Sequence, residues 1–329
     1  MNNNRIVLAG NIITDNIKMI TRWPDKGMLV PITSLKRAVG GSVCNSGIDL
    51  KTLDPSLEVA ALGMVGADDA GDFALDVLTR RGLDVSLVAR AKDVPTSFTD
   101  CMTVEGTGER TFFNMHGADS SLTPEDVNVE ALNCKIFHLG YLLLLDGLDA
   151  PDAEYETKAA RLLAKVRAAG IETSVDIVSE QSDRFARIVK PALKHCDYAV
   201  INEIEASRAT GVDKDDMRGL CEGLLRLGVR KRVVVHRPER SAAMDADGSY
   251  CELASLSLPK GWIVGSTGAG DAFCAGMLYS FMRDLDPETG MRIASCAAAA
   301  NLAVADSTSG AKSLDETMAL EQRFGRQER

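Results

Sequence analysis

Glu58-Val-Ala-Ala-Leu-Gly-Met-Val-Gly66 is the stretch that best indicates the fold of this chain. It is an apolar run with β-forming residues, which is typical of a buried strand. An amphipathic helical pattern follows it, from Asp72 to Arg81. A buried strand followed by an amphipathic helix is the repeating unit of α/β proteins, so we expect this fold class.

The same unit recurs along the chain. Arg5-Ile-Val-Leu-Ala-Gly10 predicts a first strand. Further strands are predicted at 135–142, 172–178, 198–201 and 232–235, and helical patterns lie between them at 152–169, 183–194 and 215–227. This alternation predicts a largely parallel sheet covered by helices on both faces. Such sheets bind their ligands beyond the carboxyl ends of the strands.

Two segments interrupt the alternation. Residues 12–38 have a mixed polar sequence that includes Asp15. Residues 96–116 look like two strands joined by a turn at 105–109, whose glycines suit a hairpin connection. We expect these insertions to form a small accessory sheet. Since no internal repeat or linker is visible, residues 1–329 are predicted to be one domain.

The composition excludes several classes of protein. The chain has 329 residues, 45% of them hydrophobic, and a formal net charge of -10 without a long basic patch. This charge argues against binding to nucleic acid or to an anionic membrane. None of the eight cysteines lies in a C-x-x-C pair, so reduced thiols are expected. No apolar stretch approaches the roughly 20 residues of a membrane span, and we expect a cytoplasmic protein.

The segment 265–282 contains the most informative motif, Gly268-Ala269-Gly270-Asp271, followed by an apolar helical stretch. Small residues let a backbone approach a ligand closely, and the N–H groups at a helix start attract anions. This combination suits a transferred phosphoryl group. Asp271 would lie in the first helical turn, ionised and able to accept a proton. An ordinary glycine turn with a first-turn Asp remains the alternative.

A second glycine turn lies at Gly40-Gly41-Ser42, with Ser42 as the expected N-cap of the next helix. Asn45 follows in the first turn, where its amide could bind a polyol hydroxyl. Asp15, after the first strand, could chelate two sugar hydroxyls or cap a turn. For both residues, a purely structural role remains open.

Asn202 ends a predicted strand, and Glu205 lies one turn into the next helix. Amide and carboxylate oxygens at this edge of a sheet suit a hydrated Mg²⁺ ion. Acidic residues that only complement the helix dipole are the alternative. The four histidines show no metal-ligand spacing. Since the chain has neither a G-x-x-x-x-G-K-[ST] loop nor a G-x-G-x-x-G after its first strand, P-loop and dinucleotide-binding folds are disfavoured.

Taken in order, these segments resemble one family, the PfkB or ribokinase-like carbohydrate kinases. The resemblance spans nearly the whole chain. It is carried by Gly10-Asn11 with Asp15, Gly40-Gly41 with Asn45, Leu62-Gly63-Met-Val-Gly66, Gly108-Glu109-Arg110-Thr-Phe-Phe113, Asn202-x-x-Glu205 and Gly268-Ala-Gly-Asp271.

The resemblance implies a three-layer α/β/α sandwich with a small β lid built from 12–38 and 96–116. It implies an ATP-dependent kinase that phosphorylates a hydroxyl of a sugar. Gly268, Ala269 and Gly270 would form the anion hole, and Asp271 would be the catalytic base. Glu205 and Asn202 would hold waters around the Mg²⁺ ion that bridges the ATP phosphates.

The resemblance also implies sugar contacts from Asp15, Gly40, Gly41 and Asn45. Lid residues near Phe112 and Phe113 would cover the sugar, and family members often dimerise through the lid. Arg110 is either a phosphate anchor or an exposed strand arginine.

Three positions depart from the family pattern. Gly265 replaces an Asp that helps to bind an activating monovalent cation, so potassium activation is left open. The segment 236–241 replaces a glycine-rich turn that contacts the nucleotide. Of the family's Asp-Pro-Asn sequence only Asp176 remains. A nucleoside kinase of the same fold, or a non-catalytic protein that senses sugars or nucleotides, stays open as an alternative.

Overall fold

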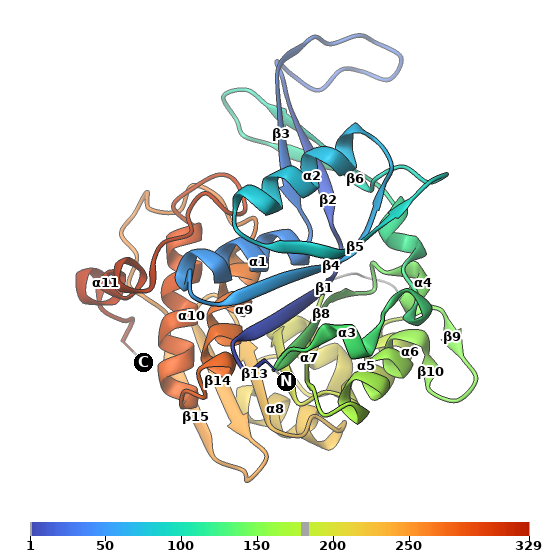
Figure 1. Cartoon of the computed structure of the whole chain (residues 1–329). Helices are drawn as coiled ribbons and strands as arrows, with labels where there is room; N and C mark the ends of the chain where they lie inside the picture. The colour runs from blue at the N-terminus through green and yellow to red at the C-terminus, as the bar shows by residue number, and fades with distance from the viewer. Residues whose placement is uncertain (1, 179–183, 329) are drawn as a thin grey trace.

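The computed structural model describes residues 2–178 and 184–328. Its main sheet has nine strands in the order β15-β14-β13-β12-β11-β8-β1-β4-β5 (Figure 1). Neighbouring strands from β13 to β5 are parallel, whereas β14 and β15 add to the edge as antiparallel strands. The strands are β1 (Arg5–Gly10), β4 (Glu58–Gly66), β5 (Asp84–Ala91), β8 (Ile136–Leu142), β11 (Glu172–Ile177), β12 (Tyr198–Asn202), β13 (Arg232–His236), β14 (Arg240–Asp245) and β15 (Tyr250–Ala254).

Helices cover both faces of this sheet because successive side chains of each strand point to opposite sides. In β1, Val7 and Ala9 pack into one core, and Ile6 and Leu8 pack into the other. The first core includes α5 (Lys158–Ala168), α6 (Phe185–Leu193), α7 (Glu203–Thr210) and α8 (Met217–Arg226). The second includes α1 (Ser42–Leu53), α2 (Asp69–Arg80), α9 (Ala269–Met282) and α10 (Pro287–Asn301), and α11 (Leu314–Phe324) packs against α10. The predicted three-layer sandwich is confirmed.

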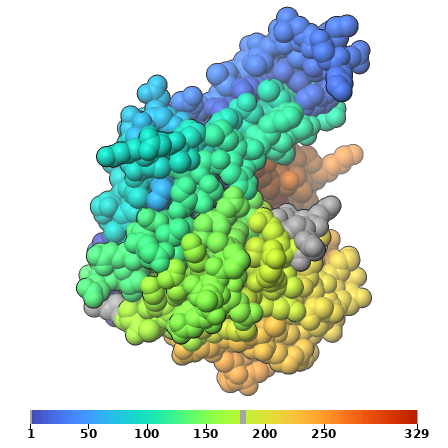
Figure 2. All heavy atoms as spheres, turned by 90° about the vertical axis from the view of Figure 1, so that its right-hand side faces the viewer, coloured from blue at the N-terminus to red at the C-terminus, as the bar shows by residue number. Residues whose placement is uncertain are grey.

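The two insertions form the predicted accessory sheet, which we call the lid. Its strands are β2 (Ile13–Ile20), β3 (Ile32–Gly40), β6 (Phe98–Val104) and β7 (Arg110–Met115), in the order β3-β2-β6-β7. The lid rises from the carboxyl edge of the main sheet (Figure 1). Figure 2 shows it standing above the body of the molecule, with the C-terminal segment set back beneath it.

Two local predictions differ from the structure, and one hairpin has no counterpart among the predictions. The helical pattern at 152–169 begins only at Lys158, because Pro151–Asp152 and Glu156–Thr157 pair as a small hairpin, β9 and β10, and Thr157 caps α5. The hairpin of β14 and β15 was not predicted. Ser42 is the first residue of α1 rather than its N-cap, which is Gly41. The predicted start of α6 at residue 183 lies outside the described residues.

Short one-turn helices complete the chain: α3 (Val129–Leu132), α4 (Asp146–Asp149) and two 3-10 turns at Ala118–Ser121 and Pro124–Asp126. All eight cysteines are free thiols, as predicted. Within the described residues, no helix has both the length and the apolar character needed to cross a bilayer.

Candidate active site

The glycine turn predicted to bind an anion lies at the start of α9. Gly268 is the N-cap, with a φ of 79°, and a Cβ there would lie 2.6 Å from the carbonyl oxygen of Ser307. Both the left-handed backbone and this close approach require glycine. A Cβ on Gly270 would meet nothing within 4 Å. The first turn of α9, whose N–H groups lack intrahelical partners, therefore opens onto free space that can receive an anion.

Asp271 follows in the same turn and is buried, with 4% of its surface exposed. The Tyr141 hydroxyl donates to its Oδ1 and Oδ2, at 2.6 and 2.7 Å, and Asn45 Nδ2 donates to Oδ2 at 2.9 Å. Burial raises the pKa of Asp271 to about 6, although both hydrogen-bond donors lower it. The carboxylate is thus mainly ionised at pH 7, and it is a stronger base than the sequence alone indicated.

A pocket of about 120 Å³ lies between the lid and the carboxyl edge of the sheet, and we call it the lid pocket. Most of its lining residues carry polar side chains, and they come from segments that are distant in sequence. It is lined by Asn11, Ile13, Gly41, Asn45, Ser97, Asn114, Met115, His116, Asp119, Tyr141 and Leu144. The predicted sugar residues Gly41 and Asn45 thus share one cavity.

Two residues that line the lid pocket have hydrogen-bond acceptors without a partner. The side-chain oxygens of Asn11 and Asn45 are buried and have no hydrogen-bond partner. Asn11 Nδ2 donates to Asp119, whose pKa is raised by burial. Because buried acceptors without donors are costly, these amide oxygens suit a ligand that carries hydroxyl groups.

Other residues predicted to bind the sugar lie elsewhere. Asp15 packs against Gly40, where an added Cβ would lie 2.4 Å from Asp15 Oδ2. Burial raises the pKa of Asp15 to about 6. Neither residue is among those that line the lid pocket. Arg110 does not line the lid pocket either, and its Nη1 donates to the carbonyl oxygen of Ala305 at 3.4 Å.

A second pocket, of about 220 Å³, lies on the other side of Tyr141, and we call it the helix pocket. It is lined by Tyr141, Asp176, Ile177, Val178, Asn202, Glu205, His236, Gly268, Gly270 and Asp271. Burial, Asp271 and Glu205 raise the pKa of Asp176 well above its usual range. No Lys or Arg occurs among the described residues of this lining, and its carboxyl and amide oxygens are the ligand type that a divalent cation such as Mg²⁺ prefers.

Asn202 and Glu205 form a reciprocal cap at the start of α7. Asn202 Oδ1 accepts from the backbone of Glu205, and Glu205 Oε2 accepts from the backbone of Asn202 at 3.0 Å. Both residues therefore have a structural role at the start of the helix, which was the alternative to metal binding. Their place in the helix pocket also fits the metal interpretation, since hydrated Mg²⁺ needs only one or two protein oxygens.

Below this pocket, ligand atoms of His138, Asp176 and Cys274 lie within 4.8 Å of one another, which the spacing of the histidines did not reveal. His138 is fully hydrogen-bonded: Nδ1 contacts Ser174 Oγ at 3.1 Å, and Nε2 contacts Cys274 Sγ at 3.9 Å. Burial lowers the pKa of His138 to about 3 and keeps the ring neutral. These contacts account for the cluster as part of the core.

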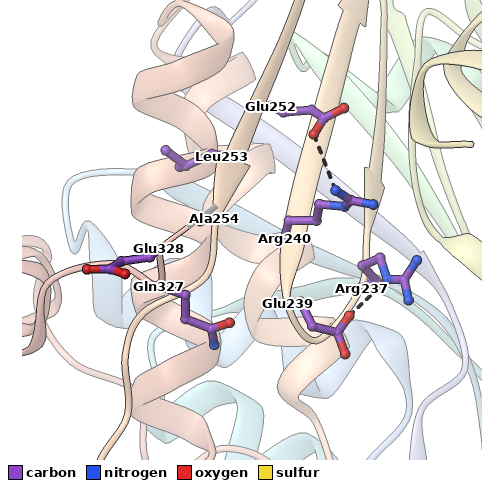
Figure 3. A pocket seen from close by; sticks show the side chains of 8 residues that line it. All are labelled: Arg237, Glu239, Arg240, Glu252, Leu253, Ala254, Gln327 and Glu328. Atoms are coloured by element: carbon purple, nitrogen blue, oxygen red, sulfur yellow. Dashed lines mark hydrogen bonds and ion pairs between the residues drawn. The ribbon is translucent and has the colours of Figure 1, made fainter. Parts of the chain in front are cut away.

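The atypical segment 236–241 forms the tight connection between β13 and β14. Beside it lies a cavity of about 350 Å³, which Figure 3 shows with charged side chains on its walls. Arg237 pairs with Glu239 at 2.9 Å and with Asp215 at 2.7 Å, and Arg240 lies 3.8 Å from Glu252. Both arginines of this segment therefore have carboxylate partners, either within the segment or next to it.

Gly265 lies close to the loop after α10. An added Cβ would lie 2.9 Å from the carbonyl oxygen of Val304, so a larger residue here would have to move that loop. The lid reaches the same loop through Lys36, which pairs with Asp306 at 3.3 Å.

Residues 3–314 match the model of the pfkB family carbohydrate kinases. The chain belongs to this family. The predicted family and enzyme class, a phosphotransferase with an alcohol acceptor, are therefore confirmed.

Relatives of this carbohydrate kinase agree with its fold. The chain is 26% identical to a ribokinase of Arabidopsis thaliana over 305 residues, which cover 91% of this chain and 76% of the relative. It is 20% identical to a nucleoside kinase of Methanocaldococcus jannaschii over 284 residues, covering 86% and 85%. A putative ribokinase II from E. coli, solved in complex with ATP and Mg²⁺, superposes with a TM-score of 0.78 at 19% identity, covering 97% of this chain and 99% of that one.

The structure also brings residues to the site that the sequence did not indicate. Tyr141, Asn11 and Asp119 are the clearest, because each is buried or half-buried and polar. Asn11 follows Gly10 in one of the segments that carry the family resemblance, but no role was predicted for its side chain. For Tyr141 and Asp119 no local pattern exists, since Tyr141 binds Asp271, 130 positions away, and Asp119 binds Asn11, 108 positions away.

Proposed function

We propose that this carbohydrate kinase transfers the γ-phosphoryl group of MgATP to a hydroxyl of a monosaccharide, with Asp271 as general base. The observation that carries the proposal is the position of Asp271. It lies in the first turn of α9, beside the open face of Gly270, and it is bonded to Asn45 and Tyr141 from the lid pocket. The base therefore lies between a hydroxyl-binding cavity and an anion site.

In the proposed reaction, the acceptor oxygen attacks the γ-phosphorus while its proton passes to the carboxylate of Asp271. The bond between the γ-phosphorus and the bridging oxygen breaks, and ADP leaves with that oxygen. A pKa of about 6 suits a base that works near neutral pH. Gly268, Ala269 and Gly270 stabilise the negative charge of the transferred group through the N-terminus of α9.

The helix pocket is the proposed site of the ATP phosphates and Mg²⁺. Its lining holds three buried carboxyl groups, those of Asp176, Glu205 and Asp271, and no described Lys or Arg. Glu205 and Asn202 would hold the ion through water, and Mg²⁺ would neutralise charge on the phosphate oxygens. The E. coli relative solved with ATP and Mg²⁺ supports this proposal.

The lid pocket is the proposed sugar site. Its volume of about 120 Å³ is small beside the roughly 300–1,000 Å³ of pockets for drug-sized ligands. This size favours a monosaccharide over a nucleoside. The unpaired oxygens of Asn11 and Asn45 would accept hydrogen bonds from sugar hydroxyls.

We also propose a homodimer formed through the lid and a cytoplasmic location. Large apolar side chains on the lid are exposed, including Leu35 at 65%, Phe112 at 57% and Phe113 at 56%. Exposed apolar surface of this kind favours association with a partner. The free cysteines support a reducing compartment.

A coupled assay of ADP release tests the substrate proposal. MgATP is offered with D-ribose, D-fructose, adenosine and inosine in parallel. We expect turnover with a sugar and a much lower kcat/KM with either nucleoside. A preference for adenosine or inosine would contradict the monosaccharide proposal and favour a nucleoside kinase.

A further inference from the structure

Tyr141 separates the two pockets of the site. Its side chain lines both the lid pocket and the helix pocket, whereas Asp271 lines only the helix pocket. The Tyr141 hydroxyl donates to both oxygens of the Asp271 carboxylate, at 2.6 and 2.7 Å. In this conformation, a sugar in the lid pocket would meet the Tyr141 hydroxyl before it met the base.

The Tyr141 phenol is a neutral donor near the end of β8, next to a turn that hydrogen bonds stabilise. Burial and the charges of Asp271 and Asp176 raise the pKa of Tyr141 well above its usual range, so it stays a neutral hydrogen-bond donor. Directly after β8 the chain turns at Leu143, which has a φ of 84°. Asp149 accepts hydrogen bonds from the backbone N–H groups of Leu143 and Leu145, and so fixes this turn.

We propose that Tyr141 is a gate whose hydroxyl occupies the acceptor-alcohol position at Asp271 until a sugar hydroxyl replaces it. The inference rests on the proposed role of Asp271. The phenol has the same O–H donor as the alcohol that the base must receive.

The gate would protect ATP from hydrolysis. Without a hydroxyl at this position, a water molecule could take its place beside Asp271 and the anion site of α9. The water oxygen would then attack the γ-phosphorus, its proton would pass to the carboxylate, and the bond to the bridging oxygen of ADP would break. The Tyr141 hydroxyl fills this position and excludes the water, because a kinase gains selectivity by excluding competing nucleophiles.

The charges around the base leave this position to neutral donors. The titratable groups that act on Asp271 or share its pocket are Tyr141 on β8, Asp176 on β11, Glu205 on α7, His236 on β13, Cys44 and Asp49 on α1 and Cys274 on α9. Burial lowers the pKa of His236 to about 4, so it is neutral at pH 7. No cation from these groups competes with the phenol for the carboxylate.

The test measures ADP release from MgATP alone, without any sugar, in the wild type and in Tyr141→Phe. Removing the hydroxyl leaves the ring in place and opens space for one water beside the base. We expect sugar-independent ADP release to rise on the order of tenfold. This is less than the roughly 10²–10⁴-fold rate gain from a positioned general base, because the water is not held as a sugar hydroxyl would be. The double variant Tyr141→Phe/Asp271→Asn should return to the wild-type rate, because the water then lacks its base.

Tyr198→Phe is the matched control. Tyr198 also donates to a carboxylate, Glu172 at 2.9 Å, but it begins β12 at the opposite edge of the sheet. The Tyr198→Phe variant should hydrolyse ATP at the wild-type rate. Thermal unfolding checks that each variant folds, and Tyr141→Met provides a second side chain without a hydroxyl.

Unchanged hydrolysis in folded Tyr141→Phe and Tyr141→Met would overturn the gate. A rise that persists in the double variant would overturn it too, because the water would then act without Asp271. Since this assay contains no sugar, its result is independent of the acceptor screen. A wild type that phosphorylates a sugar while Tyr141→Phe shows no extra hydrolysis would leave the proposed function standing and remove only the gate.

Discussion

Gly270→Ala should separate stability from catalysis in this enzyme. Gly270 lies in the first turn of α9 without a positive φ, and a Cβ there meets nothing within 4 Å. Alanine is a better helix former than glycine, so the free energy of unfolding should rise by about 0.5–1 kcal/mol. The added methyl group, however, projects into the helix pocket, where the γ-phosphoryl group is proposed to bind.

We expect kcat to fall on the order of 10- to 100-fold, since the methyl group holds the phosphoryl oxygens away from the helix N-terminus. Urea unfolding measures the stability, and coupled ADP release with a turned-over sugar measures kcat. Gly248→Ala is the control: its φ is 88° and its Cβ also meets nothing within 4 Å, so it should lose about 1 kcal/mol of stability and no activity. A fully active Gly270→Ala enzyme would refute the assignment of the anion site.

Three further predictions follow from the site and the lid. The kcat/KM for the sugar should fall as the pH drops through about 6, because Asp271 must be ionised to accept a proton; a pH–rate profile with its acid limb near 4 would argue against the raised pKa of this residue. Asn11→Ala should raise the KM for the sugar about tenfold by removing an unpaired acceptor, whereas Asn16→Ala, whose amide binds Asp100 within the lid, should leave it unchanged. The double variant Phe112→Ser/Phe113→Ser should sediment as a monomer in analytical ultracentrifugation if the exposed lid forms the dimer, and a dimer that persists would place the interface elsewhere.

Much of the fold was predictable because its signals are local. Apolar runs such as 58–66 and amphipathic helices such as α2 repeat in the order that a parallel sheet requires. The predicted start of α5 was wrong because helical periodicity extends over residues that pair as β9 and β10. Only Thr157 marks the cap. Periodicity alone does not distinguish these outcomes.

The candidate site was predictable where glycine turns and caps mark it, as at Gly268–Asp271 and Asn202–Glu205. It was not predictable where single polar residues converge from distant segments. Tyr141 is separated from Asp271 by 130 positions, and Asn11 from Asp119 by 108. Such contacts depend on the folded sheet, which places the end of β8 beside the start of α9.

The central claim is that Asp271 accepts the proton of the sugar hydroxyl. The most direct measurement is sugar-dependent ADP release by Asp271→Asn, a change that keeps the shape of the side chain and removes its basicity. Thermal unfolding and wild-type ATP affinity would show that the variant folds and binds nucleotide. The account predicts a loss in kcat of about 10²–10⁴-fold. A folded Asp271→Asn enzyme with a kcat close to the wild-type value would contradict it.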